Sequence, residues 1–255
     1  MTMTGGLLTQ ITPDPPGLAK RVVMTQQWTE LAYLHWSYDP AEVQRLLPDG
    51  ITVDTFEGRA WVGLIPFEMR DVRLRPAPVL PWVGNFIEIN VRTYVTDRFG
   101  RRAVWFFSLD VPRSLVVGVA RTAFALPYCW AKAGHERTDD RHHYWMTRRW
   151  PTASPARADM RFRVGDRIAD ADVSDLDHFL SARWALLTTR GSRVEYGRVE
   201  HPRWPLHHVH DVEITEDALV AAGLPSPEGK PHALYSPGVD VRLAWLDKIT
   251  NEETP

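Results

Sequence analysis

Cysteine and lysine are scarce in this sequence. Cys129 is the single cysteine among 255 residues, which excludes an internal disulfide and any metal site built from several cysteines. Of the 30 lysine and arginine residues only four are lysine, at positions 20, 132, 230 and 248, so few amine nucleophiles are available. Because a single cysteine is typical of a reducing compartment, we expect a cytoplasmic protein.

Long apolar runs are missing as well. The longest, Ala123 to Ala131, has nine residues and contains Pro127, whereas a helix needs about 20 apolar residues to cross a bilayer. We therefore expect no membrane segment. The first twenty residues have neither a basic start nor an apolar stretch of about seven residues, so we expect no secretory signal there.

Neither sign of charge is in excess. The 30 basic and 32 acidic side chains give a formal net charge of −2, which leaves no positive surplus to neutralise phosphates, and nucleic acid is not expected as a partner. The hydrophobic fraction of 44% is ordinary for a globular protein. The composition is compatible with a homo-oligomer.

Alternation of apolar and polar residues predicts a mainly β protein with peripheral helices, an α+β fold built on one large, curved, mostly antiparallel sheet. The Pro-rich stretch Arg75 to Trp82 is too short and too apolar for a linker. We expect one domain over residues 25–250, with a flexible tail at 1–24 and a short C-terminal tail at 251–255. Predicted strands are Ala60–Pro66, Phe86–Val95, Ala103–Asp110, Arg157–Val164, Val194–Glu200, His207–Ile214 and Val239–Leu246.

Three segments combine a capping residue with helical spacing, namely Pro40–Leu47 after Asp39, Asp175–Thr188 after Ser174, and Glu216–Ala222 after Thr215. The second is the longest of the three. Its apolar residues recur at intervals of three and four, so we expect this helix to cover one side of the sheet.

The strand Phe86–Val95 has two different faces. One carries only Ile, Val and Thr, while the other carries Phe86, Glu88, Asn90, Arg92 and Tyr94. A carboxylate, an amide, a guanidinium and two aromatics on one face are typical of a strand that lines a ligand cavity. An exposed strand face with cross-strand ion pairs explains the same pattern.

Six segments of the chain resemble the YqjF-like family of the acetoacetate-decarboxylase-like superfamily, over about residues 25–245. The resemblance implies a β-barrel or cone that encloses a cavity, with helices at its periphery, and by itself it implies no activity. The segments are LAYLHWSYDP, EGRAWVGLIPFEMRDVR, FIEINVRTYV, VWFFSLDV, ARTAFALPYCWA and LYSPGVDVRL.

The resemblance also implies a change of chemistry. Acetoacetate decarboxylases have a Gly-Arg-Glu segment, which Arg121 and its neighbours match, followed by Gly-x-Pro-Lys-Lys, whose first lysine forms a Schiff base with the substrate ketone. In this sequence Tyr128 falls at that lysine and Cys129 at the next one. A phenol cannot form an imine, so decarboxylation through a lysine imine is not expected. Glu88 falls where the decarboxylases keep a cavity glutamate.

Tyr128, Glu88 and Arg92 are therefore the predicted catalytic groups. Tyr128 can donate a proton to a ligand oxygen, with an aromatic plug of the cavity as the alternative. Glu88 and Arg92 can anchor a polar or anionic ligand, or can form an ion pair with each other.

A second set of residues is predicted to contact the ligand, namely His35, Phe86, Asn90, Tyr94 and Arg121. His35 can carry a proton near neutral pH, although a structural histidine bonded to the backbone is the simpler interpretation.

Other reactive side chains have simpler explanations. Cys129 has no assignable histidine partner, so it is predicted to be a small buried residue. Lys132 is predicted to be exposed, although it is the lysine that could restore an imine mechanism.

In the run His207, His208 and His210, the second and third histidines share a strand face and suggest a metal site, but no third ligand has a suitable spacing, and surface histidines are the simpler interpretation. His142 and His143 are expected in a loop or an exposed strand. We therefore predict no metal and no cofactor.

Two functions follow from these residues. The first is an enzyme that acts on an apolar, carbonyl- or oxygen-bearing small molecule of polyketide-like class by acid–base or shape-directed means, with lyase, isomerase or cyclase chemistry and no covalent lysine intermediate. The second is a non-catalytic protein that binds or senses such a ligand. A decarboxylase-like lyase that uses Lys132 is a third alternative.

Overall fold

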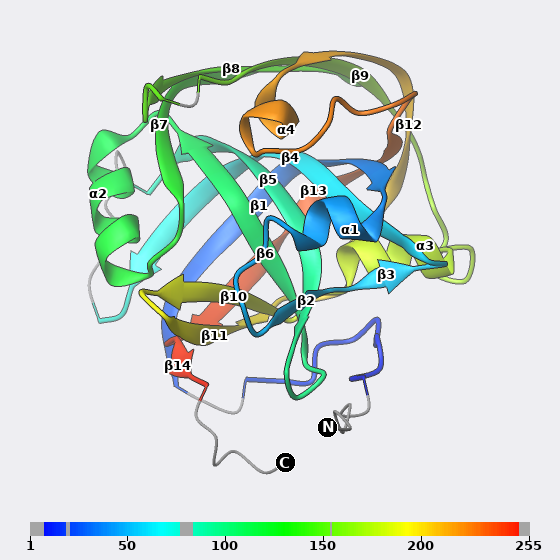
Figure 1. Ribbon diagram of the computed structural model, residues 1–255. Coiled ribbons are helices and arrows are strands. Elements are labelled where there is room, and N and C mark those ends of the chain that lie inside the picture. The colour runs from blue at the N-terminus through cyan, green and yellow to red at the C-terminus, as the bar shows by residue number, and fades with distance from the viewer. Residues whose placement is uncertain (1–7, 19–20, 77–83, 154, 250–255) are drawn as a thin grey trace.

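The computed structural model describes residues 8–18, 21–76, 84–153 and 155–249 (Figure 1). Two predictions fall partly or wholly on other residues. The predicted C-terminal tail, 251–255, and most of the Pro-rich stretch after Arg75 lie outside the described residues. Part of the predicted N-terminal tail is described, and β1 begins inside it at Val22.

Among the described residues, fourteen strands form one sheet, which confirms the predicted mainly β fold. The predicted strands are all present, although β13 ends at Ala244, two residues before its predicted end. The strands are Val22–Tyr38 (β1), Ile51–Val53 (β2), Thr55–Phe56 (β3), Arg59–Leu74 (β4), Phe86–Asp97 (β5), Arg102–Val111 (β6), Tyr128–Thr138 (β7), Arg141–Trp150 (β8), Arg157–Arg167 (β9), Ala185–Arg190 (β10), Arg193–Glu200 (β11), His207–Glu216 (β12), His232–Ala244 (β13) and Asp247–Lys248 (β14).

Helices are few and short: Pro40–Gln44 (α1), Ser114–Ala123 (α2), Asp175–Ser181 (α3) and Ala218–Ala221 (α4). Asp39 caps α1 as predicted, because its side chain accepts a hydrogen bond from the backbone N–H of Ala41. The α2 helix was not predicted.

The predicted helix Asp175–Thr188 is wrong in its second half. Ser174 caps α3 as predicted, but the helix ends at Ser181, since Ala182 leaves the helical region with φ −85° and ψ 75°. The chain then enters β10, which pairs with β6 and β11. Pairing within the sheet thus outweighs the local helical spacing.

The prediction for the last helix is also wrong at its start. The residue before the helix is Asp217 rather than Thr215, and Glu216 still belongs to β12.

The sheet closes on itself twice. One ring runs β11-β10-β6-β5-β4-β1-β13 and returns to β11, and the other runs β6-β7-β8-β9-β12-β13-β1-β4-β5 and returns to β6. We call these the cavity ring and the second ring. They share the strands β13, β1, β4, β5 and β6, which we call the shared wall (Figure 1).

Alternate residues of the shared wall therefore face two different interiors. On β5, Ile89 and Val91 pack in the core of the second ring, whereas Phe86 packs in the core of the cavity ring. Both faces of this strand are buried from Glu88 to Asp97. The alternative of an exposed strand face is thus wrong, because the closed sheet has an interior on each side.

Two irregularities in the pairing of β1 with β4 determine which side chains of these strands face the cavity. The register of β1 against β4 shifts by one residue between Thr25 and Gln27, and again between Thr29 and Leu34. Asp71 and Glu30, in the corresponding stretches, adopt positive φ values of 51° and 54°. An extra residue in a strand reverses the face of every residue beyond it.

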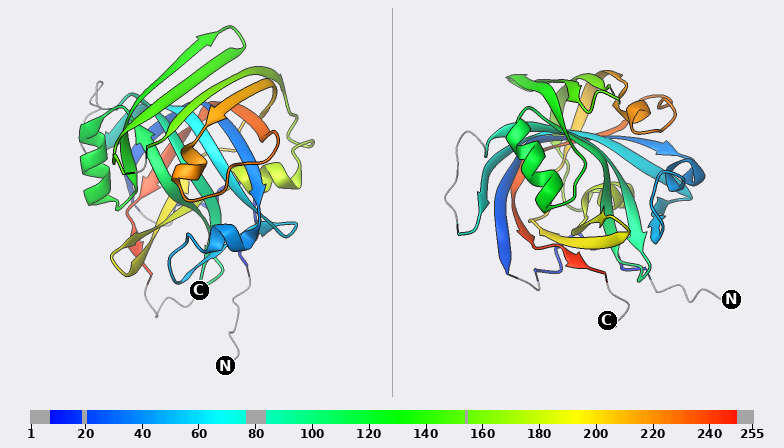
Figure 2. Two further views of the ribbon diagram at one scale, coloured as in Figure 1. Left: turned by 45° about the horizontal axis from the view of Figure 1, so that its top comes forward. Right: turned by 60° about the vertical axis from the view of Figure 1, so that its left-hand side comes forward.

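The helices α2 and α3 lie on opposite sides of the molecule, beside the cavity ring (Figure 2). A segment before β1 also contacts the fold, because Trp184 Nε1 donates to the carbonyl of Thr12 and Arg203 pairs with Asp14. None of the described helices is long and apolar enough to cross a membrane.

Candidate functional site

The cavity ring encloses a cavity of about 370 Å³. Most of its lining is apolar and comes from several strands of the ring and from α2. At the α2 side the lining residues Leu74, Leu115 and Val119 are exposed to solvent, at 42%, 58% and 46%. The cavity therefore opens at an apolar mouth beside α2, a typical feature of small-molecule sites.

Glu88 and Tyr128 meet inside this cavity. The Tyr128 hydroxyl donates to Glu88 Oε2 at 3.0 Å, and both residues line the cavity. Asn90, on the same strand as Glu88, donates from Nδ2 to Glu88 Oε1 at 3.4 Å. Because no cation pairs with Glu88 among the described residues, it is a buried carboxyl held only by neutral donors.

Burial dominates the acid–base properties of this pair. It raises the pKa of Glu88 to about 7, although the hydrogen bonds from Tyr128 and Asn90 act in the opposite direction. Burial, and then the neighbouring Glu88, raise the pKa of Tyr128 well above its ordinary value. Glu88 thus changes charge near neutral pH, while Tyr128 stays a neutral hydrogen-bond donor.

The loop after α2 and the first strand pairs of β7 fix Tyr128. Tyr128 pairs with Leu109 of β6 in parallel register, and the Tyr128 carbonyl accepts a hydrogen bond from Arg121 Nη1 at 2.7 Å. Ala125 in this loop adopts φ 52°, which turns the chain back toward the sheet. Arg121 is exposed and does not line the cavity, so it contacts the backbone of Tyr128 from outside the cavity.

Cys129 is buried, as its simpler interpretation predicts. Its thiol donates to the carbonyl of Pro127 at 3.6 Å, and burial raises its pKa to about 11. A thiol with such a pKa is protonated at neutral pH and is a poor nucleophile.

Of the other predicted residues, Arg92 and Phe86 line the cavity, whereas Asn90, Tyr94 and His35 do not. His35 Nε2 donates to the Tyr94 hydroxyl at 2.7 Å, and that hydroxyl donates to the carbonyl of Leu180 at 2.6 Å. Burial lowers the pKa of His35 well below its ordinary value. His35 is thus buried and neutral, and its partner is a side chain rather than the backbone.

Several polar groups of the cavity were not predicted from the sequence. Arg183, His201, Trp28 and Trp204 all line it. Burial lowers the pKa of His201 to about 4, so this imidazole is neutral at pH 7. Arg183 falls within a predicted helix, and no sequence motif marks Trp28 or Trp204 as cavity residues. Only the pairing of strands in the closed sheet shows that these side chains line the cavity.

Lysine contributes nothing to the cavity lining among the described residues. Lys132 is exposed, and its ammonium lies 5.4 Å from the centre of the Trp145 ring. His208 and His210 are exposed neighbours on β12, with ring centres 6.5 Å apart. Within the described ranges no cluster of three or more side chains is suited to hold a metal ion.

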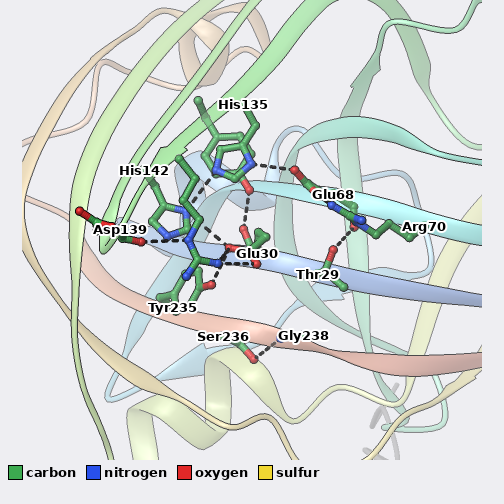
Figure 3. Close-up of polar contacts among 12 residues, drawn as sticks. Thr29, Glu30, Glu68, Arg70, His135, Asp139, His142, Tyr235, Ser236 and Gly238 are labelled. Carbon is green, nitrogen blue, oxygen red and sulfur yellow. Dashed lines mark hydrogen bonds and ion pairs between the residues drawn. The ribbon is translucent and has the colours of Figure 1, made fainter.

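A second polar cluster lies across the shared wall from the cavity (Figure 3). His135 Nδ1 lies 2.8 Å from Glu68 Oε1, and His135 Nε2 lies 3.1 Å from His142 Nδ1. The hydrogen bond from His135 is the main reason that the pKa of Glu68 is lowered to about 2. Burial lowers the pKa of His142 to about 4. The expectation that His142 is exposed is wrong, because β8 is covered here.

Glu30 closes this cluster on β1. Its carboxylate accepts hydrogen bonds from Tyr235 at 2.8 Å and from Arg137 at 3.0 Å, and its carbonyl accepts one from Tyr144 at 2.5 Å. We call Glu30, Glu68, His135 and His142 the histidine cluster. The two-residue turn Asp139-Asp140 between β7 and β8 sets the register that brings its histidines together, and this turn was the available sequence signal.

Comparisons with known proteins place this geometry in a family. Residues 25–240 match DUF2071, described as an uncharacterized conserved protein. The chain belongs to the DUF2071 family. The chain is also similar to a Bacillus subtilis (strain 168) protein named "Uncharacterized protein YqjF". The two are 34% identical over 224 residues, which are 88% of this chain and 90% of that protein.

Solved structures share the fold of this DUF2071 chain. An acetoacetate decarboxylase-like enzyme from Sphingomonas wittichii RW1 superposes with a TM-score of 0.62 at 12% identity, over 96% of this chain and 100% of that one. Acetoacetate decarboxylase from Legionella pneumophila gives 0.62 at 11% identity over 92% of each chain. The enduracididine biosynthesis enzyme MppR gives 0.60 at 12% identity over 97% of each chain. At such identities the similarity shows the fold alone.

Proposed function

We propose that the cavity binds a medium-sized apolar molecule carrying carbonyl or other oxygens, and that Glu88 and Tyr128 perform acid–base chemistry on it without a lysine Schiff base. The observation that carries this proposal is the hydrogen bond of 3.0 Å between two buried groups that line an otherwise apolar cavity. Apolar lining supplies affinity, and a few polar groups fix the orientation of the ligand.

The chemistry that suits this pair is proton transfer next to a carbonyl. With a pKa of about 7, ionised Glu88 can take a proton from the carbon beside the carbonyl. The Tyr128 hydroxyl then turns to the ligand and donates a hydrogen bond to the enolate oxygen that forms. Glu88 returns the proton to carbon at the same or another position. Such general acid–base groups work best when their pKa is near the working pH.

The arrangement of lysines supports a non-covalent mechanism. Lys132 is exposed, and among the described residues the cavity has no lysine that could form an imine. One neighbour in fold, MppR, has been solved in complex with pyruvate. We take a carbonyl compound as the probe class on this basis, and a polyketide-like ligand fits the same chemistry.

The test is exchange of solvent deuterium into the carbons beside a carbonyl, followed by proton NMR with 2-heptanone as the probe. The wild type should exchange faster than buffer. Tyr128→Phe and Glu88→Gln should each slow the exchange by roughly a hundredfold, the usual contribution of a positioned acid or base. Sodium borohydride with 2-heptanone should leave the mass of the protein unchanged.

Each result separates the alternatives. Binding of a neutral apolar dye without any exchange would identify a non-catalytic binding or sensing protein. A stable borohydride adduct on Lys132 would restore the decarboxylase-like mechanism. Exchange that is equal in the wild type and in Tyr128→Phe would show that Tyr128 only fills space.

A further inference from the structure

The end of the cavity nearest α3 carries an arginine, Arg92, that has no carboxylate partner in the described part of the chain. Arg92 is 8% exposed and lines the cavity. Its Nη2 donates to the carbonyl of Leu180 at 3.4 Å, and its guanidinium carbon lies 5.4 Å from the centre of the Tyr33 ring. Among the described residues, Nε has no hydrogen-bond acceptor and no carboxylate forms an ion pair with this guanidinium. A buried charge without a partner is costly.

Arg183, two residues after the end of α3, forms an ion pair but also has an unused donor. It is 5% exposed, and its Nη1 donates to Asp54 Oδ2 at 2.8 Å. The same oxygen also accepts a hydrogen bond from Arg102 at 2.8 Å, so one carboxylate serves two guanidinium groups. Within the described chain, Nη2 of Arg183 is buried without an acceptor.

Hydrogen-bond donors are in excess over acceptors at this end. The buried indole N–H groups of Trp28 and Trp204, which also line the cavity, have no acceptor among the described residues. Among the described residues of the lining, Glu88 supplies the one carboxyl. Oxygen atoms that carry negative charge are the groups that satisfy such donors best.

The opposite end of the cavity has the reverse character. Its mouth beside α2 is formed by Leu74, Leu115 and Val119, and α2 and α3 lie on opposite sides of the molecule (Figure 2). The cavity is thus apolar at its mouth beside α2 and cationic at the end nearest α3.

We propose that the ligand is an amphiphilic monocarboxylate whose carboxylate binds Arg92 and Arg183 and whose apolar chain extends toward α2. This inference rests on the proposed function, because it names the head group of the ligand of the same cavity. Arg92 lies four residues from Glu88 on β5, about 13 Å along the strand. The carboxylate is therefore bound away from the Glu88–Tyr128 pair, and carbons further along the chain face that pair.

The test uses two ten-carbon probes of equal chain length, decanoate and decan-1-ol, which displace the neutral dye N-phenyl-1-naphthylamine at pH 7.5. The wild type should bind decanoate at least tenfold more tightly than decanol. Arg92→Gln should weaken decanoate binding at least tenfold and change decanol binding less than twofold. Arg92→Lys, which retains the charge, should recover part of the affinity for decanoate.

The control is Arg161→Gln, which removes an exposed guanidinium that pairs with Asp159 on β9 and does not line the cavity. It should leave both probes within twofold. Equal affinities of the wild type for decanoate and decanol would overturn the carboxylate subsite while the proposed function stands. Failure of the dye and of both probes to bind would overturn the proposed function itself. If Arg92→Gln does not fold, the comparison of the two probes on the wild type still decides the question.

Discussion

Glu68 and Glu88 lie next to each other across two paired strands and have opposite acid–base properties. Phe67 pairs with Glu88, and Glu68 pairs with Ile87, so the two carboxyls point to opposite faces of the shared wall. Hydrogen bonding to His135 lowers the pKa of Glu68 to about 2, whereas burial raises that of Glu88 to about 7. Position in the sheet alone thus does not set a pKa, and the partners of the carboxyl decide it.

The two regions also differ in how their polar groups are satisfied. In the histidine cluster each carboxylate has cationic or hydrogen-bonding partners (Figure 3). In the cavity, Arg92 Nε and Arg183 Nη2 have no acceptor among the described residues. Mutual pairing is typical of a structural cluster, and unused donors are typical of a site that gains partners from a ligand.

The largest effect is expected from Glu88→Gln. The carboxyl titrates at about 7 in the fold against its ordinary 4.5, so the folded chain holds the proton more tightly. Its contribution to stability is fully present below pH 4.5 and is lost as the pH rises through 7. Urea unfolding should show that the wild type loses about 3 kcal/mol relative to the variant between pH 4.5 and pH 8. Parallel stability curves of the two proteins would contradict this.

Glu68→Gln should give the opposite dependence on pH. The pKa of Glu68 lies below its ordinary value, so its contribution is present above pH 4.5 and is lost as the pH falls through about 2. At pH 7 the variant should be less stable by about 2 kcal/mol, after allowance for solvent screening of a partly exposed carboxylate. The deficit, measured by urea unfolding, should shrink toward pH 2. A deficit that does not change with pH would show that packing, not charge, is lost.

The smallest expected effect is a difference in stability between two variants of Glu30, which distinguishes the contribution of the backbone conformation from that of the side chain. Both Glu30→Gly and Glu30→Ala remove the carboxylate that binds Arg137 and Tyr235. Because residue 30 has φ 54°, glycine should be more stable here than alanine by about 1 kcal/mol. Thermal or urea unfolding of the two variants measures this difference. If alanine is the more stable, the irregularity in β1 is not conserved in the variants.

The sequence was sufficient for the local pattern of β5 but not for its surroundings. Alternation placed Glu88 and Arg92 on one face, and both side chains line the cavity. That the other face is also buried depends on the closure of the sheet, which involves strands far apart in the chain. The alternative prediction, an ion pair between Glu88 and Arg92, is wrong. Arg92 instead contacts the Tyr33 ring and the carbonyl of Leu180.

Local spacing was misleading where sheet pairing decides the structure. Trp184 and Leu187 continue the helical interval of α3, yet Leu187 pairs with Trp105 in β6. The residue before α2 is Arg113, whose side chain does not cap the helix, so the capping signal that identified α1 and α3 is missing there. Contacts such as that between His135 and His142 depend on the register of two strands, which only the turn between them specifies.

The shared wall also limits how this chain can change length during evolution. Deleting one residue between Phe86 and Arg92 would exchange the two faces of β5, so that Ile87 or Ile89 would enter the cavity and Glu88 would enter the apolar core of the second ring. Insertions and deletions in these strands should therefore occur in pairs of residues, or at irregular positions such as Glu30, where the strand already accommodates an extra residue.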